Sequence, residues 1–254
     1  MRVFTETVGT NGAQLTGYVQ SDSEQLSNAA VRPAVLVLPG GGYQHCSDRE
    51  AEPVALAYLA EGFNAFVLRY SVGPDATFDD ALADARAALM TLQERAAELR
   101  ADPVRVAAVG FSAGGHLAAA LGTTGDLQPG ALVLGYPVTL ADMGPKMGTQ
   151  IPEIGERVTA ETPPTFVFST RDDAVVPIEN SLALAVALDR AGVDFELHVY
   201  ASGVHGLSLA KPLTANGRAD YVNEPVQAWL AQSVAFLRRL WGDFPVPVET
   251  ADFR

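Results

Sequence analysis

The sequence predicts an α/β fold, in which a mostly parallel, twisted β-sheet carries helices on both faces. Two observations lead to this prediction. Short apolar runs of strand length alternate along the chain with longer segments of helical periodicity, and several of those runs are continuously apolar, as in strands buried on both faces. The length and composition agree with it, because 254 residues with 48% hydrophobic and 19% charged residues suit one soluble domain with a large core. We therefore expect residues 1–254 to form a single domain.

The chain begins with two strand-like segments, residues 2–8 and 14–20, in which β-branched and aromatic residues are frequent. An Asn-Gly turn signal at residues 10–12 separates them, which predicts an antiparallel hairpin. After a polar loop, the continuous apolar run at residues 34–38 predicts the first strand that is buried on both faces.

Strands and helices then alternate. Further strands are expected at residues 64–70, 104–109, 131–135, 165–169 and 194–200, and helices at residues 50–61, 78–99, 113–121, 178–190 and 224–241. In the segment 78–99, apolar residues recur in steps of four and three, which predicts one apolar helix face. We assign the carboxylates Asp79, Asp80, Asp84 and Glu94 to its solvated face, and we expect the tail, residues 242–254, to lie on the surface.

Charge and cysteine content exclude several classes of function. The chain has 17 Lys and Arg against 30 Asp and Glu, a formal charge of −13, which repels phosphate backbones and anionic membranes and excludes nucleic acid as a partner. The single cysteine, Cys46, allows no intrachain disulfide and no cysteine-rich zinc cluster, and we expect no metal and no cofactor. The sequence has no apolar signal core and no run of 18 apolar residues, so we expect a cytoplasmic protein without a membrane anchor.

A Gly-x-Ser-x-Gly motif occupies residues 110–114, between the strand 104–109 and a helix of small residues. This pattern is typical of a sharp strand-to-helix turn that exposes a nucleophilic serine, here Ser112. The glycines at 110 and 114 leave space where backbone segments approach closely. A chance match in a glycine-rich turn is the alternative, but the strand before and the helix after the motif favour the nucleophile.

Three glycines follow the strand 34–38 in the segment Pro39-Gly-Gly-Gly-Tyr43. Successive glycines expose backbone N–H groups without side chains in the way, and such a group of donors can stabilise a developing oxyanion. Taken alone, the segment is more typical of a plain flexible turn. Combined with a serine on an adjacent turn, it predicts an oxyanion hole.

A serine nucleophile needs a histidine base, and four histidines compete for that role. His45 and His116 precede every plausible acid in the chain, whereas this type of turn is followed by the acid and then the histidine. His198 lies in the middle of a predicted strand. His205, in the loop after the strand 194–200, is therefore the predicted base.

Two adjacent carboxylates, Asp172 and Asp173, follow the strand 165–169 and can supply the acid. Residue chemistry alone does not separate them, and the carboxylate that is not the acid would cap the next helix or pair with Arg171. Between residues 138 and 164, a stretch rich in Gly, Pro, Met and Thr follows a strand end, where ligands bind in α/β sheets. We expect it to form a short lid or pocket wall around an open site.

Four ordered motifs together resemble a known family. Pro39-Gly-Gly-Gly-Tyr, Gly-Phe-Ser-Ala-Gly-Gly-His-Leu, Asp-Ala-Val-Val-Pro177 and His-Gly-Leu are similar to those of α/β-hydrolase esterases close to bacterial acetyl xylan esterases and hormone-sensitive-lipase-like carboxylesterases. The resemblance spans residues 34–240. It implies the α/β-hydrolase fold and Asp173 as the acid, four residues before Pro177. Proline stands at position 39 where the hormone-sensitive-lipase type has histidine, which favours the acetyl-xylan-esterase-like branch.

The resemblance also implies the other site residues and the activity. Backbone N–H groups of Gly41, Gly42 and Ala113 would form the oxyanion hole. We expect a metal-free serine esterase that acts on short-chain, above all acetyl, esters of small molecules, acetylated sugars among them. A peptidase or amidase on the same fold is an alternative. A non-catalytic hydrolase-like binding module is another, although intact Ser, Asp and His argue against it.

Overall fold

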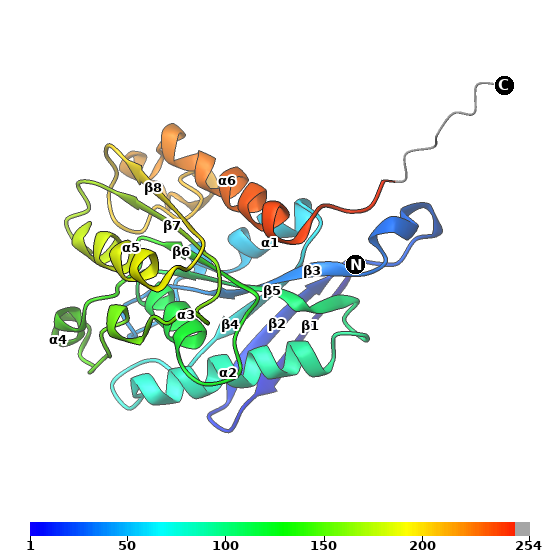
Figure 1. Ribbon diagram of the computed structural model, residues 1–254, viewed down its shortest axis with the longest axis horizontal. Coiled ribbons are helices and arrows are strands. Elements are labelled where there is room, and N and C mark those ends of the chain that lie inside the picture. The colour runs from blue at the N-terminus through cyan, green and yellow to red at the C-terminus, as the bar shows by residue number, and fades with distance from the viewer. Residues whose placement is uncertain (247–254) are drawn as a thin grey trace.

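The computed structural model of the chain describes residues 1–246, and its centre is one eight-stranded β-sheet (Figure 1). The strand order across the sheet is β1-β2-β4-β3-β5-β6-β7-β8. The strands are β1 (Arg2–Val8), β2 (Ala13–Val19), β3 (Arg32–Leu38), β4 (Asn64–Arg69), β5 (Ala101–Phe111), β6 (Ala131–Gly135), β7 (Thr165–Thr170) and β8 (Phe195–Tyr200). β1 and β2 form an antiparallel hairpin, β2 is antiparallel to β4, and all later neighbours are parallel. The predicted fold class is confirmed.

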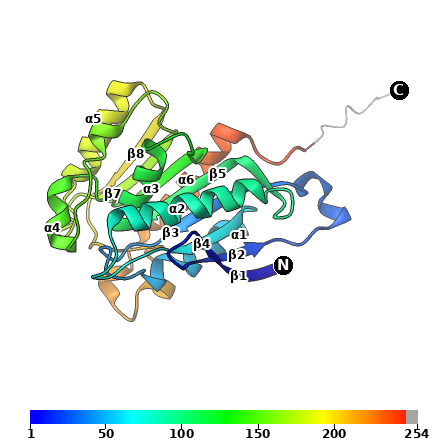
Figure 2. The same cartoon turned by 90° about the horizontal axis from the view of Figure 1, so that it is seen from below.

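Helices cover both faces of the sheet. α2 (Phe78–Glu94), α3 (Ala113–Thr123) and α5 (Glu179–Ala191) lie on one face, and α1 (Glu52–Ala60) and α6 (Glu224–Trp241) lie on the other (Figures 1 and 2). Each face has its own buried apolar cluster. In the cluster under α6, Trp229 stacks on Phe168 of β7 with ring centroids 4.7 Å apart. Because both faces are covered, the central strands are buried and apolar over most of their length.

Two helices are shorter than their apolar pattern predicts. The segment predicted as helical from 78 to 99 ends at Glu94, yet Leu99 is fully buried, so the apolar period continues into a turn that packs on the core. The segment predicted from 50 to 61 begins at Glu52, with Pro53 in its first turn, where the missing N–H costs nothing. Glu50 therefore lies outside that helix, in the 3₁₀ turn Asp48–Glu50.

The assignment of all four α2 carboxylates to solvent is correct for Glu94, which is exposed, but wrong for Asp84. Asp79 is exposed and Asp80 closes a capping box with Thr77, but Asp84 is fully buried. Its Oδ2 accepts hydrogen bonds from Ser71 N–H at 2.8 Å and Ser71 Oγ–H at 2.6 Å. The carboxylate stabilises the chain that leaves β4, a tertiary role that helical periodicity does not reveal.

Two further segments, residues 138–164 and residues 242–246 after α6, consist mostly of loops and short turns. Residues 138–164 contain two 3₁₀ turns and the short helix α4 (Gly144–Met147). After α6, Phe244 lies against Gly62 and under the guanidinium of Arg32, 5.5 Å from its ring centroid. The expected surface position of residues 247–254 lies outside the described residues. Within residues 1–246, no helix combines the length and apolarity that a membrane crossing requires.

Candidate active site

The turn at residues 110–114 is built by close backbone contacts. A Cβ on Gly110 would lie 2.2 Å from the carbonyl oxygen of Gly114, and a Cβ on Gly114 would lie 2.1 Å from that of Leu38. Only glycine fits at either position, because real Cβ atoms do not approach backbone oxygens so closely. Between them Ser112 has φ 53° and ψ −118°, a strained conformation for a residue with a side chain. Its backbone is held by a hydrogen bond from Ser112 N–H to Gly135 O and by one from Val138 N–H to Ser112 O.

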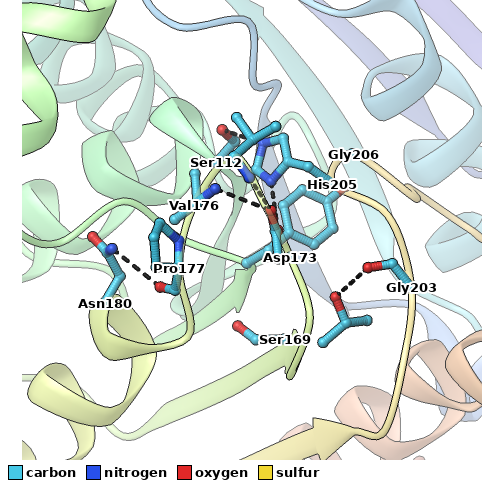
Figure 3. A network of polar contacts seen from close by, with 12 residues as sticks. Ser112, Ser169, Asp173, Val176, Pro177, Asn180, Gly203, His205 and Gly206 are labelled. Atoms are coloured by element: carbon cyan, nitrogen blue, oxygen red, sulfur yellow. Dashed lines mark hydrogen bonds and ion pairs between the residues drawn. The ribbon is translucent and has the colours of Figure 1, made fainter.

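Three side chains from separate strand ends form one hydrogen-bonded chain. His205 Nε2 lies 2.9 Å from Ser112 Oγ, and His205 Nδ1 lies 2.7 Å from Asp173 Oδ2. Figure 3 shows the three side chains pointing toward one another. Ser112 follows β5, Asp173 follows β7, and His205 follows β8, so the carboxyl ends of parallel strands bring them together. A hydroxyl, an imidazole and a carboxylate in this order can move a proton from the hydroxyl to the imidazole.

The two adjacent aspartates have different partners. The side chain of Asp173 is only 1% exposed, and its Oδ1 accepts the N–H groups of Val175 and Val176 at 2.9 and 3.0 Å. These bonds fix the carboxylate while Oδ2 faces His205. Asp172 is exposed and accepts the N–H of Gly203 at 2.8 Å, which joins the two loops that carry Asp173 and His205.

The other histidines lie elsewhere. His198 lies on β8, stacked on Phe166 with ring centroids 4.8 Å apart. His116 is fully buried in α3, and burial lowers its pKa from 6.5 to about 4. Its Nε2 faces Pro152 O at 3.1 Å, which can only accept, so Nδ1 accepts the hydroxyl of Tyr43 at 2.8 Å. His45 is exposed at the rim of the pocket described next.

A pocket of about 390 Å³ opens beside Ser112 and His205. Gly41 and Gly42, with φ of 132° and 64°, line it with their backbone, a conformation that favours glycine. Within residues 1–246, neither of their N–H groups donates a hydrogen bond. Ala113 begins α3, where N–H groups have no partner inside the helix. The structure therefore brings the three predicted donor residues next to Ser112, with N–H groups free to bind an anion.

The pocket is lined by both apolar and polar side chains. The segment 138–164 supplies Val138, Met143, Lys146 and Met147, and the loop after Asp173 adds Val175 and Val176. Polar residues from two other segments also line it: His45, Ser47, Arg49, Glu50 and Tyr221. No group of three or more His, Cys, Asp or Glu side chains in the described part of the chain is arranged to hold a metal ion.

Two family models match parts of the chain. A model described as BD-FAE matches residues 23–133, which include the glycine loop and Ser112. A model of the prolyl oligopeptidase family matches residues 152–236, which include Asp173 and His205. The curated acetylxylan esterase of Xylanibacter ruminicola is 30% identical over 196 residues, 68% of this chain and 40% of that protein. The chain spans less than half the length of the first curated relatives that it matches, 35% and 40%.

Solved structures extend the similarity over nearly the whole chain. The acetyl ester-xyloside bifunctional hydrolase from Caldicellulosiruptor lactoaceticus is 33% identical with a TM-score of 0.78, over 92% of this chain and 90% of that one. MGS-M1, an α/β-hydrolase enzyme from a Medee basin deep-sea metagenome library, is 43% identical with a TM-score of 0.88, over 94% and 98% of the two chains. The chain belongs to the α/β-hydrolase esterases. That family consists of carboxylic ester hydrolases, as the resemblance of the four motifs implies.

Sequence reasoning missed two residues at the centre of this α/β-hydrolase site. Glu50 is 3% exposed, although its pattern predicts an ordinary helix residue. Tyr136, directly after β6, has φ 37° and packs its ring edge-on against His205, with centroids 5.0 Å apart. Burial, and then the charge of Glu50, raises the pKa of the Tyr136 hydroxyl well above its ordinary value, so it remains a donor. The position of Tyr136 at a strand end was the only signal in the sequence.

Proposed function

We propose that the chain is a serine esterase that hydrolyses short-chain acyl esters, acetyl esters above all, through a covalent acyl-enzyme. The observation that carries this proposal is the continuous hydrogen-bonded chain from Ser112 through His205 to Asp173. In this mechanism Ser112 Oγ attacks the ester carbonyl while His205 Nε2 takes its proton. His205 then gives that proton to the leaving alcohol, and the acyl group stays on Ser112. Water, activated by the same imidazole, hydrolyses the acyl-enzyme and restores the serine.

Asp173 would fix the imidazole so that Nε2 faces the serine. Its carboxylate is buried and is already bound by two backbone N–H groups, so it cannot turn away from His205. A buried carboxylate 2.7 Å from Nδ1 also stabilises the imidazolium that forms when the serine proton moves.

The N–H groups of Gly41, Gly42 and Ala113 would hold the negative oxygen of the tetrahedral intermediates. Gly41 and Gly42 line the pocket beside Ser112 in a conformation that favours glycine, so their N–H groups need no backbone rearrangement when the charge develops. Loss of one such donor costs about 10²–10³ in rate in a measured case on another protein.

The pocket supports a small acyl group and a polar alcohol. The apolar side chains of Met143, Met147 and Val176 line it, and about 390 Å³ has to hold both halves of the substrate. The named activities of the relatives, acetylxylan esterase and acetyl ester-xyloside hydrolase, agree with acetylated sugars as substrates. We also propose that the chain acts as one domain, with residues 138–164 as a short pocket wall.

A series of p-nitrophenyl esters tests this function. We expect kcat/KM to be highest for the acetate and to fall by about tenfold or more from acetate to octanoate, because the pocket has to hold the leaving group together with the acyl chain. In Ser112→Ala, turnover is expected to fall by about 10⁴-fold or more while the melting temperature stays nearly unchanged. A serine-directed phosphonate should label wild-type protein at Ser112. Folded protein that neither hydrolyses the acetate nor takes the label would contradict the proposal.

An amidase or peptidase is the second candidate, because the prolyl oligopeptidase model matches residues 152–236. Two substrates that differ only in the bond to be cleaved separate an amidase from an esterase. Acetyl-p-nitroanilide carries the same acyl group as p-nitrophenyl acetate but releases an amine. A kcat/KM for the anilide within about tenfold of that for the ester would favour the amidase. We expect the anilide to be turned over far more slowly.

A further inference from the structure

Glu50 is a buried carboxylate next to the proposed catalytic groups, but it takes no part in the proton transfer. It lies in the 3₁₀ turn Asp48–Glu50, lines the same pocket as Ser112, and is 3% exposed. Its two oxygens have different partners: Oε2 accepts the N–H of Gly40 at 2.9 Å, and Oε1 accepts the hydroxyl of Tyr136 at 2.6 Å. Within residues 1–246 it forms no ion pair with a cationic side chain. A buried charge held only by neutral donors is costly unless both bonds are kept.

The two partners of Glu50 belong to opposite sides of the site. Gly40 begins the glycine loop, and the next two residues, Gly41 and Gly42, supply the proposed oxyanion donors. Glycine is required at position 40, because a Cβ there would lie 2.7 Å from Glu50 Oε2 and 2.8 Å from a backbone oxygen of β5. The carboxylate thus fixes where the loop begins and how closely it approaches the serine turn.

Tyr136 connects Glu50 to the histidine. Its ring packs edge-on against the imidazole of His205, and its hydroxyl oxygen accepts the N–H of Ser208 at 2.9 Å. Ser208 belongs to the loop that follows His205. One carboxylate therefore bridges the glycine loop and, through Tyr136, the loop of the proposed base.

The neighbouring residue reinforces the same loop. Arg49 donates hydrogen bonds to the carbonyl oxygens of Gly206 and Thr214, the latter at 2.6 Å, and stacks on Tyr221 with its guanidinium 4.1 Å from the ring centroid. Arg49 and Glu50 are consecutive, so one short turn holds the base loop by its carbonyls and the glycine loop by its first N–H.

From these contacts we propose that Glu50 is a positioning residue that sets the distance between the oxyanion donors and the base. The inference rests on the proposed function, since it concerns the same site. Its physical basis is that donors and base act on one reacting carbonyl, and a displacement of about 1 Å between them can cost about 10²-fold in rate. Hydrogen bonds to a charged acceptor are stronger than those to a neutral one, which suits a carboxylate in this role.

Glu50→Gln is the direct test. Glutamine has the same shape, but only one of its two terminal atoms accepts, whereas Gly40 N–H and the Tyr136 hydroxyl both donate to Glu50. With the amide oxygen facing Gly40 N–H, the Tyr136 hydroxyl proton loses its acceptor, and the tyrosine oxygen can only receive a hydrogen bond from the amide. With p-nitrophenyl acetate we expect kcat to fall by about 10- to 100-fold and KM to change by less than about threefold. The matched control is Asp48→Asn, which removes the same charge from the same turn at an exposed residue, and it should leave both constants near wild type.

A second measurement separates positioning from mere stability. An alkylboronic acid forms a tetrahedral, anionic adduct on Ser112 Oγ and so mimics the oxyanion state. We expect its inhibition constant in Glu50→Gln to rise by the same factor as kcat/KM falls. Wild-type kcat and boronate affinity in folded Glu50→Gln would overturn the positioning role and leave the proposed function intact. Equal losses in Asp48→Asn would overturn it as well, because a general charge effect would then explain the result.

If Glu50→Gln does not fold, Tyr136→Phe tests the proposal instead, because it removes only one of the two hydrogen bonds to Glu50. Tyr136→Phe keeps the ring against His205 and removes only the hydroxyl, and we expect a fall in kcat of about 3- to 10-fold. Unchanged kcat in folded Tyr136→Phe would then overturn the proposal. Wild-type protein without turnover and without phosphonate labelling would overturn the proposed function, and this inference with it.

Discussion

Acidification should destabilise the fold through His116, a residue outside the proposed proton transfer. His116 is fully buried in α3 between Tyr43 and Pro152, and burial lowers its pKa to about 4. In the unfolded chain the pKa is 6.5, so the unfolded state binds a proton first as the pH falls. The stability that neutral His116 provides is complete above about pH 6.5 and is lost progressively down to about pH 4.

The size of the effect follows from the two pKa values. The whole difference corresponds to about 3 kcal/mol in the free energy of unfolding, and about 2 kcal/mol of it is lost between pH 7 and pH 5. That is a considerable part of a typical folding free energy of about 5–15 kcal/mol. The group is fully buried, so solvent and salt screen little of it.

Urea unfolding at pH 7, 6 and 5 measures this contribution when wild type is compared with His116→Gln. Glutamine offers one acceptor for the Tyr43 hydroxyl and one donor for the Pro152 carbonyl, and it does not titrate. Carboxylates titrate equally in both proteins, so the difference between them isolates His116. We expect wild type to lose about 2 kcal/mol more than the variant from pH 7 to pH 5. Parallel pH curves for the two proteins would refute the reasoning.

Two further predictions concern the turns that carry the site. Asp173→Asn should lower kcat by about 10²–10⁴-fold, because the amide cannot hold the imidazole as the carboxylate does, whereas Asp172→Asn should stay roughly within threefold of wild type. The reverse ranking in steady-state kinetics would transfer the acid role to Asp172. Gly114→Ala should destabilise the fold by about 3 kcal/mol, because its Cβ would lie 2.1 Å from a carbonyl oxygen of β3. The control for thermal unfolding is Gly155→Ala, because a Cβ there would lie 3.7 Å from its nearest atom, an ordinary contact distance. Equal melting temperatures for Gly114→Ala and Gly155→Ala would disprove the steric argument.

The parts of the fold that the sequence predicts are those whose pattern is local. The apolar runs predict β3, β4, β6 and β7 to within two residues at either end, because strands buried on both faces need apolar side chains. The edge strand β8, in which Glu196 and His198 alternate with apolar residues, is predicted to within one residue by its strand-like composition. The proposed nucleophile, acid and base were found because each follows a predicted strand. Helix ends were less accurate: the apolar period through Leu99 reflects burial, and burial continues after α2 has ended at Glu94.

Buried polar side chains in tertiary contacts were not predictable in the same way. Asp84 and Glu50 are both acidic residues in or beside polar helical segments, where a solvated position is the ordinary expectation. Their burial depends on donors elsewhere in the chain, Ser71 for Asp84 and Tyr136 for Glu50. The pair Glu50 and Tyr136 is separated by 86 positions. No local periodicity carries that information, since only the strand order of the sheet brings the two residues together.

The glycine loop is anchored by side chains from several elements. Its first carbonyl, Pro39 O, accepts the hydroxyl of Tyr70 at 2.6 Å, Gly40 N–H is held by Glu50, and Tyr43 is held by His116 of α3. Glycine is therefore needed there for close approach, while rigidity comes from the anchors. Buried hydrogen bonds at both ends of the segment 39–43 therefore favour a fixed loop over a flexible turn. Such a loop loses little conformational entropy when an anion binds. Anchors on both sides of Gly41 and Gly42 are what a preorganised donor pair requires.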